Sequence, residues 1–66
     1  MTPSQMPPAP DRRIWYAVYG GQRYRVETWD GVVVAADGEI VQDLLAEFAC
    51  DAKATLRAMG ATIEEG

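Results

Sequence analysis

Aromatic side chains and arginines are crowded together in the first half of this chain. Five of the six aromatic residues fall between positions 15 and 29, and four arginines lie among them or just before them. Each large ring carries about 150 to 250 Å² of surface, and a chain of 66 residues buries only about 60% of what it exposes when unfolded. We therefore expect some rings to remain exposed for a partner protein. The expected anchors are Trp15, Tyr16, Tyr19 and Trp29.

The same cluster allows a second hypothesis, because rings flanked by guanidinium groups also hold single-stranded nucleic acid. The whole chain has a net charge of −4. Residues 1–36 carry four arginines against three acids, a net +1, whereas residues 37–66 carry two basic residues against seven acids, a net −5. A charge of +1 is small for binding a phosphate backbone, so a protein partner is favoured. The nucleic-acid alternative would use Arg12, Arg13, Arg23 and Arg25.

Three acids, Glu39, Asp43 and Glu47, are spaced by four in the second half of the chain. On a helix this spacing puts them on one side, most simply as a solvated face. A functional reading is a charged row that steers a basic partner. These acids do not suggest catalysis, because they would line up on an exposed face rather than converge in a pocket. A fold of this size is also expected to have little room for a cleft.

Composition argues against several classes of function. The chain has no histidine, which removes the usual general base and the commonest metal ligand. Its single cysteine, Cys50, forms no internal disulfide, and we interpret it as a small apolar residue of a helix in a protein of the cytoplasm. No apolar run is long enough to span a membrane. We expect no enzyme activity, no cofactor and no metal.

Two hairpins are predicted before position 36. Residues 14–19 are β-branched and aromatic, and Gly20 and Gly21 follow them as a turn. Residues 23–29 alternate in polarity, and Asp30-Gly31 before the next apolar run is a strong hairpin signal. A two-residue turn there places Trp29 opposite Val32, Thr28 opposite Val33 and Val26 opposite Ala35. The predicted core face of the sheet is Tyr24, Val26, Thr28, Val33 and Ala35.

The register of the first hairpin is open. A two-residue Gly20-Gly21 loop pairs Trp15 and Ala17 with Val26 and Tyr24. A three-residue loop that includes Gln22 brings Tyr16 and Val18 to those places instead. A slip of one residue moves every side chain to the other face of the sheet. Under either register, the first strand is apolar on both faces.

The pattern changes to helical spacing after Asp37-Gly38. Apolar residues recur at intervals of three and four residues from Ile40 to Met59, and Gly60 is placed to end a helix. A continuous helix over 39–59 would be about 31 Å long, longer than a six-residue strand of about 20 Å. It therefore overhangs the sheet or breaks near Ala49–Asp51, with Asp51 capping a second helix over 52–59. Residues 61–63 either form a short edge strand or pin the terminus through Ile63.

The predicted fold is α+β: a three-stranded antiparallel meander with one amphipathic C-terminal helix, broken or not near Cys50, packed on one face. A disordered proline-rich leader covers 1–11, and a single domain covers 12–66.

The stretch from Trp29 to Val34 followed by the segment from Leu56 to Ile63 resembles short uncharacterised open reading frames of actinobacteria and their phages. The likeness covers positions 24–63. It implies a phage or mobile-element origin. By analogy of size and charge with anti-CRISPR proteins, we expect an inhibitor or adaptor that binds a host protein. We also expect a homodimer joined through the first strand or through an open aromatic face.

Overall fold

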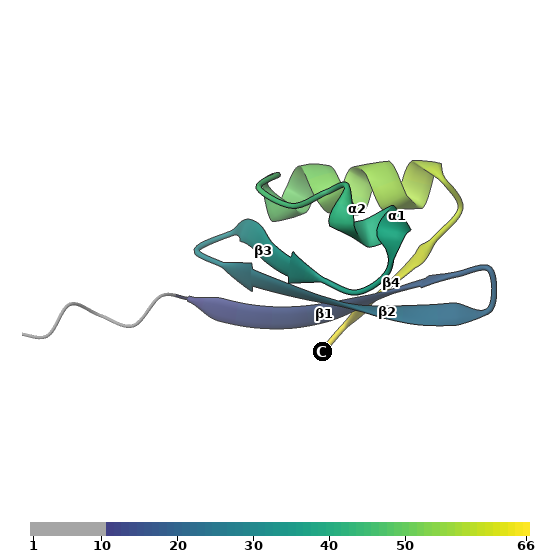
Figure 1. Ribbon diagram of the computed structural model, residues 1–66, viewed down its shortest axis with the longest axis horizontal. Coiled ribbons are helices and arrows are strands. Elements are labelled where there is room, and N and C mark those ends of the chain that lie inside the picture. The colour runs from purple at the N-terminus through teal and green to yellow at the C-terminus, as the bar shows by residue number, and fades with distance from the viewer. Residues whose placement is uncertain (1–10) are drawn as a thin grey trace, which may run out of the picture.

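The computed structural model describes residues 11–66 (Figure 1). The predicted leader over 1–11 lies outside the described residues except for Asp11. The chain forms an antiparallel sheet with two helices, which confirms the α+β class. Three strands were predicted and four occur. The fourth is the short edge strand near the end of the chain, which was predicted as one of two alternatives. The elements are β1 (Arg12–Tyr19), β2 (Gln22–Trp29), β3 (Val32–Ala36), α1 (Glu39–Gln42), α2 (Ala49–Ala58) and β4 (Thr62–Glu65).

The strand order is β3-β2-β1-β4, so β1 lies inside the sheet between β2 and β4. Figure 1 shows both helices on one side of this sheet, while the other side carries no helix. Because β1 is paired on both sides, the expected homodimer contact through the first strand is wrong.

The first hairpin adopts the two-residue register. Tyr19 pairs with Gln22 across Gly20 and Gly21, whose φ angles of 59° and 78° suit a primed turn. Trp15 therefore lies opposite Val26, and Ala17 lies opposite Tyr24. The pleat turns Trp15 and Ala17 toward the helices. It turns Ile14, Tyr16 and Val18 toward the open side.

The second hairpin follows the prediction near its turn and departs from it farther along. Thr28 pairs with Val33 as predicted, and Asp30 and Gly31 both have positive φ. A β-bulge then shifts the register, so Val26 pairs with Ala36 instead of the predicted Ala35. The extra residue bends β3 and increases its twist. Ala36 consequently packs against the core, and Ala35 is exposed.

Of the two alternatives for the helical segment, the broken helix forms, and the break lies between Gln42 and Ala49, before the predicted position at 49–51. After α1 the chain turns through Ala46, whose φ is 70°, and runs beside β3. The Ala46 N–H donates to the Val33 carbonyl, and the Val33 N–H donates to the Glu47 carbonyl. These bonds satisfy the outer edge of β3, which a continuous helix would have left unpaired. Phe48, not Asp51, is the N-cap of α2.

The core lies between the sheet and the helices. Its largest fully buried side chains are Trp15, Leu56, Val26, Val33 and Val41. Of the predicted helical stripe, Val41, Ala52 and Leu56 are buried, whereas Leu45, Phe48 and Met59 are exposed. The exposed members lie at or beyond the helix ends, where the break removes them from a single helical face. Cys50 is exposed on α2.

Among the glycines with positive φ, Gly38 is the one whose replacement should cost most. It has φ of 80°, and a Cβ there would lie 2.6 Å from two carbons of the Tyr24 ring. Gly31 has nearly the same φ of 81° but no atom within 4 Å of such a Cβ. We expect Gly38→Ala to lower the free energy of unfolding by about 1 to 3 kcal/mol more than Gly31→Ala, measured by urea denaturation. Equal losses in the two variants would show that the Tyr24 contact does not constrain Gly38.

Candidate functional site

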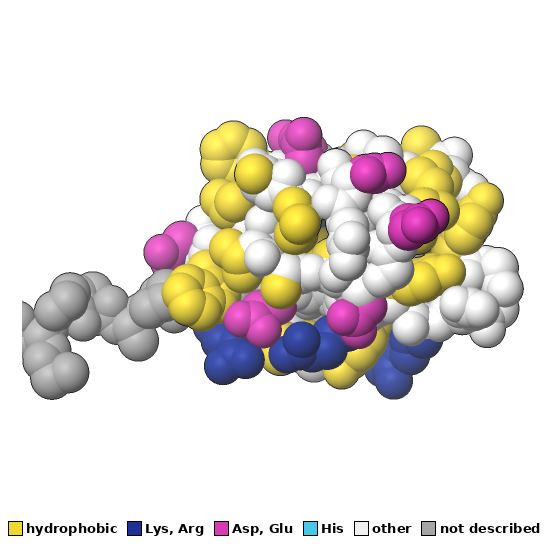
Figure 2. Space-filling view, viewed as in Figure 1, with side chains coloured by type: hydrophobic (Ala, Val, Ile, Leu, Met, Phe, Trp, Pro, Cys, Tyr) yellow, Lys and Arg dark blue, Asp and Glu magenta, His cyan; other side chains and the backbone are white. Residues whose placement is uncertain are grey.

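The side of the sheet that no helix covers, called here the open face, carries the arginine and aromatic mixture. Figure 2 shows the basic side chains gathered along the lower side of the molecule, away from the helices. Strand pairing places alternate residues of β1 and β2 on this face. Its members on these two strands are Arg12, Ile14, Tyr16, Val18, Arg23, Arg25, Glu27 and Trp29.

The four predicted aromatic anchors do not lie together. Trp15 is only 2% exposed and belongs to the core, so its proposed role as a surface anchor is corrected. Tyr16 is half-buried on the open face, with the Arg23 guanidinium carbon 3.8 Å from its ring centre. Tyr19 is exposed at the end of the first hairpin, and Trp29 is 44% exposed at the opposite end of the sheet.

Phe48 joins Trp29 in a surface that sequence reasoning missed. Trp29 pairs with Val32, and Val32 makes an antiparallel bridge with Phe48. Residues directly opposite each other point to the same side, so these three side chains form an apolar row. Phe48 is 63% exposed, the most exposed large apolar side chain of residues 11–66. Hydrophobic side chains follow one another along that end of the molecule in Figure 2.

Glu27 organises the charged part of the open face. One of its oxygens accepts a hydrogen bond from Trp29 Nε1 at 2.6 Å, and both Arg12 and Arg25 form ion pairs with the carboxylate. The Trp29 hydrogen bond is the largest cause that lowers the pKa of Glu27, and Arg12 and Arg25 lower it further. Glu27 therefore stays ionised and holds the Trp29 indole in one orientation.

The arginines of the nucleic-acid alternative are divided between the two sides of the sheet. Arg12, Arg23 and Arg25 lie on the open face. Arg13 points to the helix side and pairs with Asp11 at 3.1 Å. Each open-face arginine already has a carboxylate, since Arg23 pairs with Glu64 at 2.9 Å and the other two share Glu27.

The predicted acidic row is not a row on one helix. Glu39 begins α1, Asp43 is the C-cap of α1, and Glu47 lies in the segment beside β3. All three side chains are exposed. The helix break separates Glu47 from the other two, so the common helical face on which the steering hypothesis rested does not exist.

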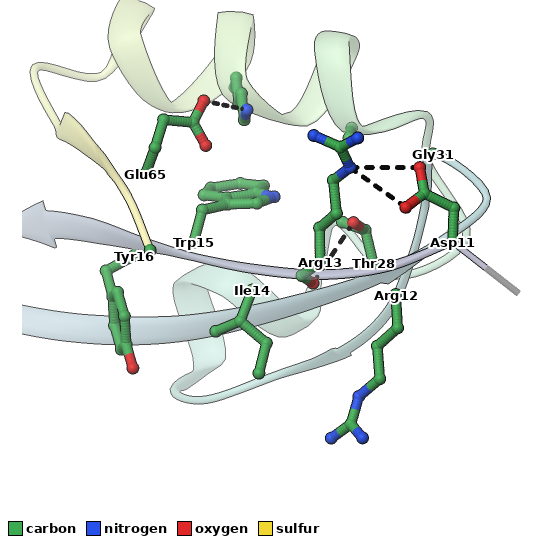
Figure 3. Close-up of a pocket in the computed structure, with 12 residues that line it drawn as sticks. Asp11, Arg12, Arg13, Ile14, Trp15, Tyr16, Thr28, Gly31 and Glu65 are labelled. Carbon is green, nitrogen blue, oxygen red and sulfur yellow. Dashed lines mark hydrogen bonds and ion pairs between the residues drawn. The ribbon is translucent and has the colours of Figure 1, made fainter.

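A second site lies on the helix side of β1, although the sequence predicted little room for a cleft. A groove of about 940 Å³ runs between the start of β1, the first turns of α2 and the end of β4. Its residues include Arg13, Trp15, Thr28, Ala49, Lys53 and Glu65. Figure 3 shows the nitrogen-bearing edge of the Trp15 indole turned toward Arg13.

The Trp15 Nε1 is buried, and it has no hydrogen-bond partner among residues 11–66. Leaving a buried donor unpaired costs about 1 to 3 kcal/mol, so few native side chains remain in that state. Lys53 is close by, with Nζ 5.2 Å from the Trp15 ring centre, and it pairs with Glu65. The groove therefore combines one free donor with three cations, because Arg12 lines it as well.

Within residues 11–66, no group of three or more histidine, cysteine or acidic side chains is placed to hold a metal ion. No helix in this part of the chain is long and apolar enough to cross a membrane.

Comparison of the chain with protein-family models, with curated proteins and with solved structures found no significant match. The resemblance to short actinobacterial and phage reading frames therefore stays a prediction, and the site must be interpreted from its own geometry.

The pH dependence of stability tests the Glu27 cluster. Because the pKa of Glu27 is lower in the folded protein than its ordinary value of 4.5, its contribution is present above that pH. The contribution is lost as the pH falls through the folded-state pKa. We expect Glu27→Gln to reduce the loss of stability below about pH 4.5, measured by urea denaturation across pH.

Glu39→Gln, which removes an exposed acid away from the open face, is the control and should leave the acid-induced loss of stability unchanged. If Glu27→Gln loses stability on acidification as steeply as the wild type, the cluster does not hold Glu27 in its ionised form.

Proposed function

We propose that this protein is a non-catalytic binding domain whose partner protein contacts the open face at the apolar row of Trp29, Val32 and Phe48. The observation that carries the proposal is the exposure of Trp29 and Phe48, at 44% and 63%, in one row that crosses β2, β3 and the N-cap of α2. Exposed aromatic side chains of this kind are the usual anchors of protein interfaces.

The Trp29 ring and the backbone that carries Phe48 are held in place before any partner arrives. Trp29 is fixed by its hydrogen bond to Glu27. Phe48 is fixed through its backbone, because the neighbouring Ala49 N–H donates to the Gly31 carbonyl at 2.7 Å. Side chains that are already ordered lose less conformational entropy on binding, which favours affinity.

The surroundings of the apolar row match the usual arrangement of a protein interface. Arg12, Arg25 and Glu27 lie beside Trp29 as a polar border. An apolar centre with a polar rim is typical of interfaces between separately folded proteins. Rim charges mainly set the rate and selectivity of association rather than its strength.

Inhibitors and adaptors bind a partner without catalysing a reaction. This protein has such a role toward a host protein. The phage or mobile-element origin belongs to the same proposal and is implied by the resemblance of positions 24–63, whereas the inhibitor role is supported by size and charge alone. A second copy of the chain is the alternative occupant of the open face, because Trp15–Val18 of β1 are already paired on both sides. Sedimentation of the purified protein separates self-association from binding of another protein.

Binding to single-stranded nucleic acid is the weaker alternative. The Arg23 guanidinium over Tyr16 is the arrangement that favours it. Against it, every arginine of the open face is already paired with a glutamate, and phosphate would have to displace these carboxylates. These arginine–glutamate ion pairs of the open face thus favour a protein partner over nucleic acid.

Replacement of the exposed rings should abolish partner binding without unfolding the domain. We expect Trp29→Ala and Phe48→Ala each to weaken binding by about 2 kcal/mol or more, as interface anchors do. Met59→Ala is the matched control, because Met59 is an exposed apolar residue at the far end of α2. Affinity capture from a host lysate with mass spectrometry identifies the partner, and calorimetry with that partner measures the losses.

Retention of full affinity by both ring variants would contradict the proposal. So would an equal loss in Met59→Ala, because that result would place the contact elsewhere.

Single-stranded oligonucleotides should leave the fluorescence of Trp29 unchanged at low salt. A base stacked on this ring would quench its emission, and a phosphate contact would make the quenching depend on salt. A Trp15→Phe variant makes Trp29 the sole tryptophan and assigns the signal. Saturable quenching that weakens with added salt would favour the nucleic-acid alternative over the protein partner.

A further inference from the structure

The groove extends around the start of β1, because Arg12, Ile14 and Tyr16 line it together with Arg13 and Trp15. Its lining does not include Trp29, Val32 or Phe48, the residues of the apolar row. The proposed function makes no use of this groove. Its volume of about 940 Å³ is within the range of sites for small molecules. It therefore requires its own interpretation.

The unpaired Trp15 Nε1 indicates what the groove would recognise. This nitrogen can only donate a hydrogen bond, so its partner must supply an acceptor oxygen or nitrogen. Only 2% of Trp15 is exposed, and Figure 3 shows its nitrogen facing the Arg13 side of the groove. A guanidinium beside a free N–H donor favours an acceptor that carries negative charge.

The ion pairs at the groove show how an anion could enter. Arg13 is held by Asp11, and the two side chains are 75% and 60% exposed. An exposed ion pair of this kind is weak and opens readily. Its opening frees the Arg13 guanidinium, and a ligand that draws this side chain outward would reach the Trp15 nitrogen, which faces Arg13 in Figure 3.

The charges of the groove select the kind of anion. The side chains that line it carry three positive charges, on Arg12, Arg13 and Lys53, and two negative charges, on Asp11 and Glu65, so they sum to +1. A doubly charged phosphate would meet two carboxylates on the walls. A single carboxylate is better matched, because its two oxygens can accept from Trp15 and from Arg13 at once.

We propose that this groove binds a small organic monocarboxylate. Its carboxylate accepts a hydrogen bond from Trp15 Nε1 and pairs with Arg13 in place of Asp11. Its apolar body lies along Ala49 and the indole edge, which line the same groove.

Benzoate is a suitable probe. It is titrated into the full chain at constant ionic strength, and two-dimensional proton–nitrogen NMR spectra record its binding. The two indole N–H groups give separate signals, and Trp29→Phe assigns them. Benzoate should shift the Trp15 indole signal downfield and saturably. The Trp29 signal, whose proton is already donated to Glu27, should stay in place and serves as an internal control.

Two variants and two other probes complete the test. Arg13→Gln should weaken benzoate binding about tenfold or more, and Arg57→Gln, which changes an exposed arginine of α2 outside the groove lining, should not. Benzamide, which lacks the charge, and inorganic phosphate should bind more weakly than benzoate.

The proposal is overturned if the Trp15 signal does not move, or if both indole signals move together. It is also overturned if benzamide or phosphate binds as tightly as benzoate, or if the two arginine variants behave alike. The groove lining contains none of Trp29, Val32 and Phe48, so the groove proposal and the proposed function fail or succeed separately.

Discussion

The two-residue turn at Gly20 and Gly21 decides which side of the sheet each side chain of β1 occupies. Both residues have positive φ, a conformation that glycine adopts without the steric cost paid by other residues. With this turn, Trp15 enters the core and Tyr16 joins the open face. The core, the groove and the open face all follow from that assignment, because a shift by one residue would exchange the contents of the two faces.

The edge of β3 imposes the second constraint. Its outer backbone groups are satisfied by the segment that contains Ala46 and Glu47, and forming those bonds interrupts the helix. The interruption frees Phe48 from a helical face and brings it beside Val32. A requirement of backbone hydrogen bonding thus creates the exposed row that the proposed function uses.

The predictable parts of this molecule are those where one local pattern dominates. Alternation in β2 and the Asp30-Gly31 pair predicted the second hairpin correctly near its turn. The first register stayed open because β1 is apolar on both faces, so polarity does not distinguish Trp15 from Tyr16. The β-bulge was missed, and the helix break, given as one of two alternatives, was placed at 49–51 although it lies between Gln42 and Ala49, because both features arise from contacts between distant segments. The apolar row depends on that break, so only Trp29 of its members was predicted as a surface anchor.

The register of β1 against β2 is the claim on which the two faces rest, and NMR cross-strand contacts measure it directly. The Asp30 N–H donates to the Asp11 carbonyl, so these two residues are a hydrogen-bonded pair of the ladder. Hydrogen-bonded and non-hydrogen-bonded pairs alternate along antiparallel strands, so Tyr16 and Arg25 are a non-hydrogen-bonded pair with closely spaced α-carbons. We expect a strong nuclear Overhauser effect between the Hα protons of Tyr16 and Arg25. A contact from Tyr16 to Val26 in its place would mean a three-residue turn, with Trp15 on the open face and Tyr16 in the core, and would contradict this account.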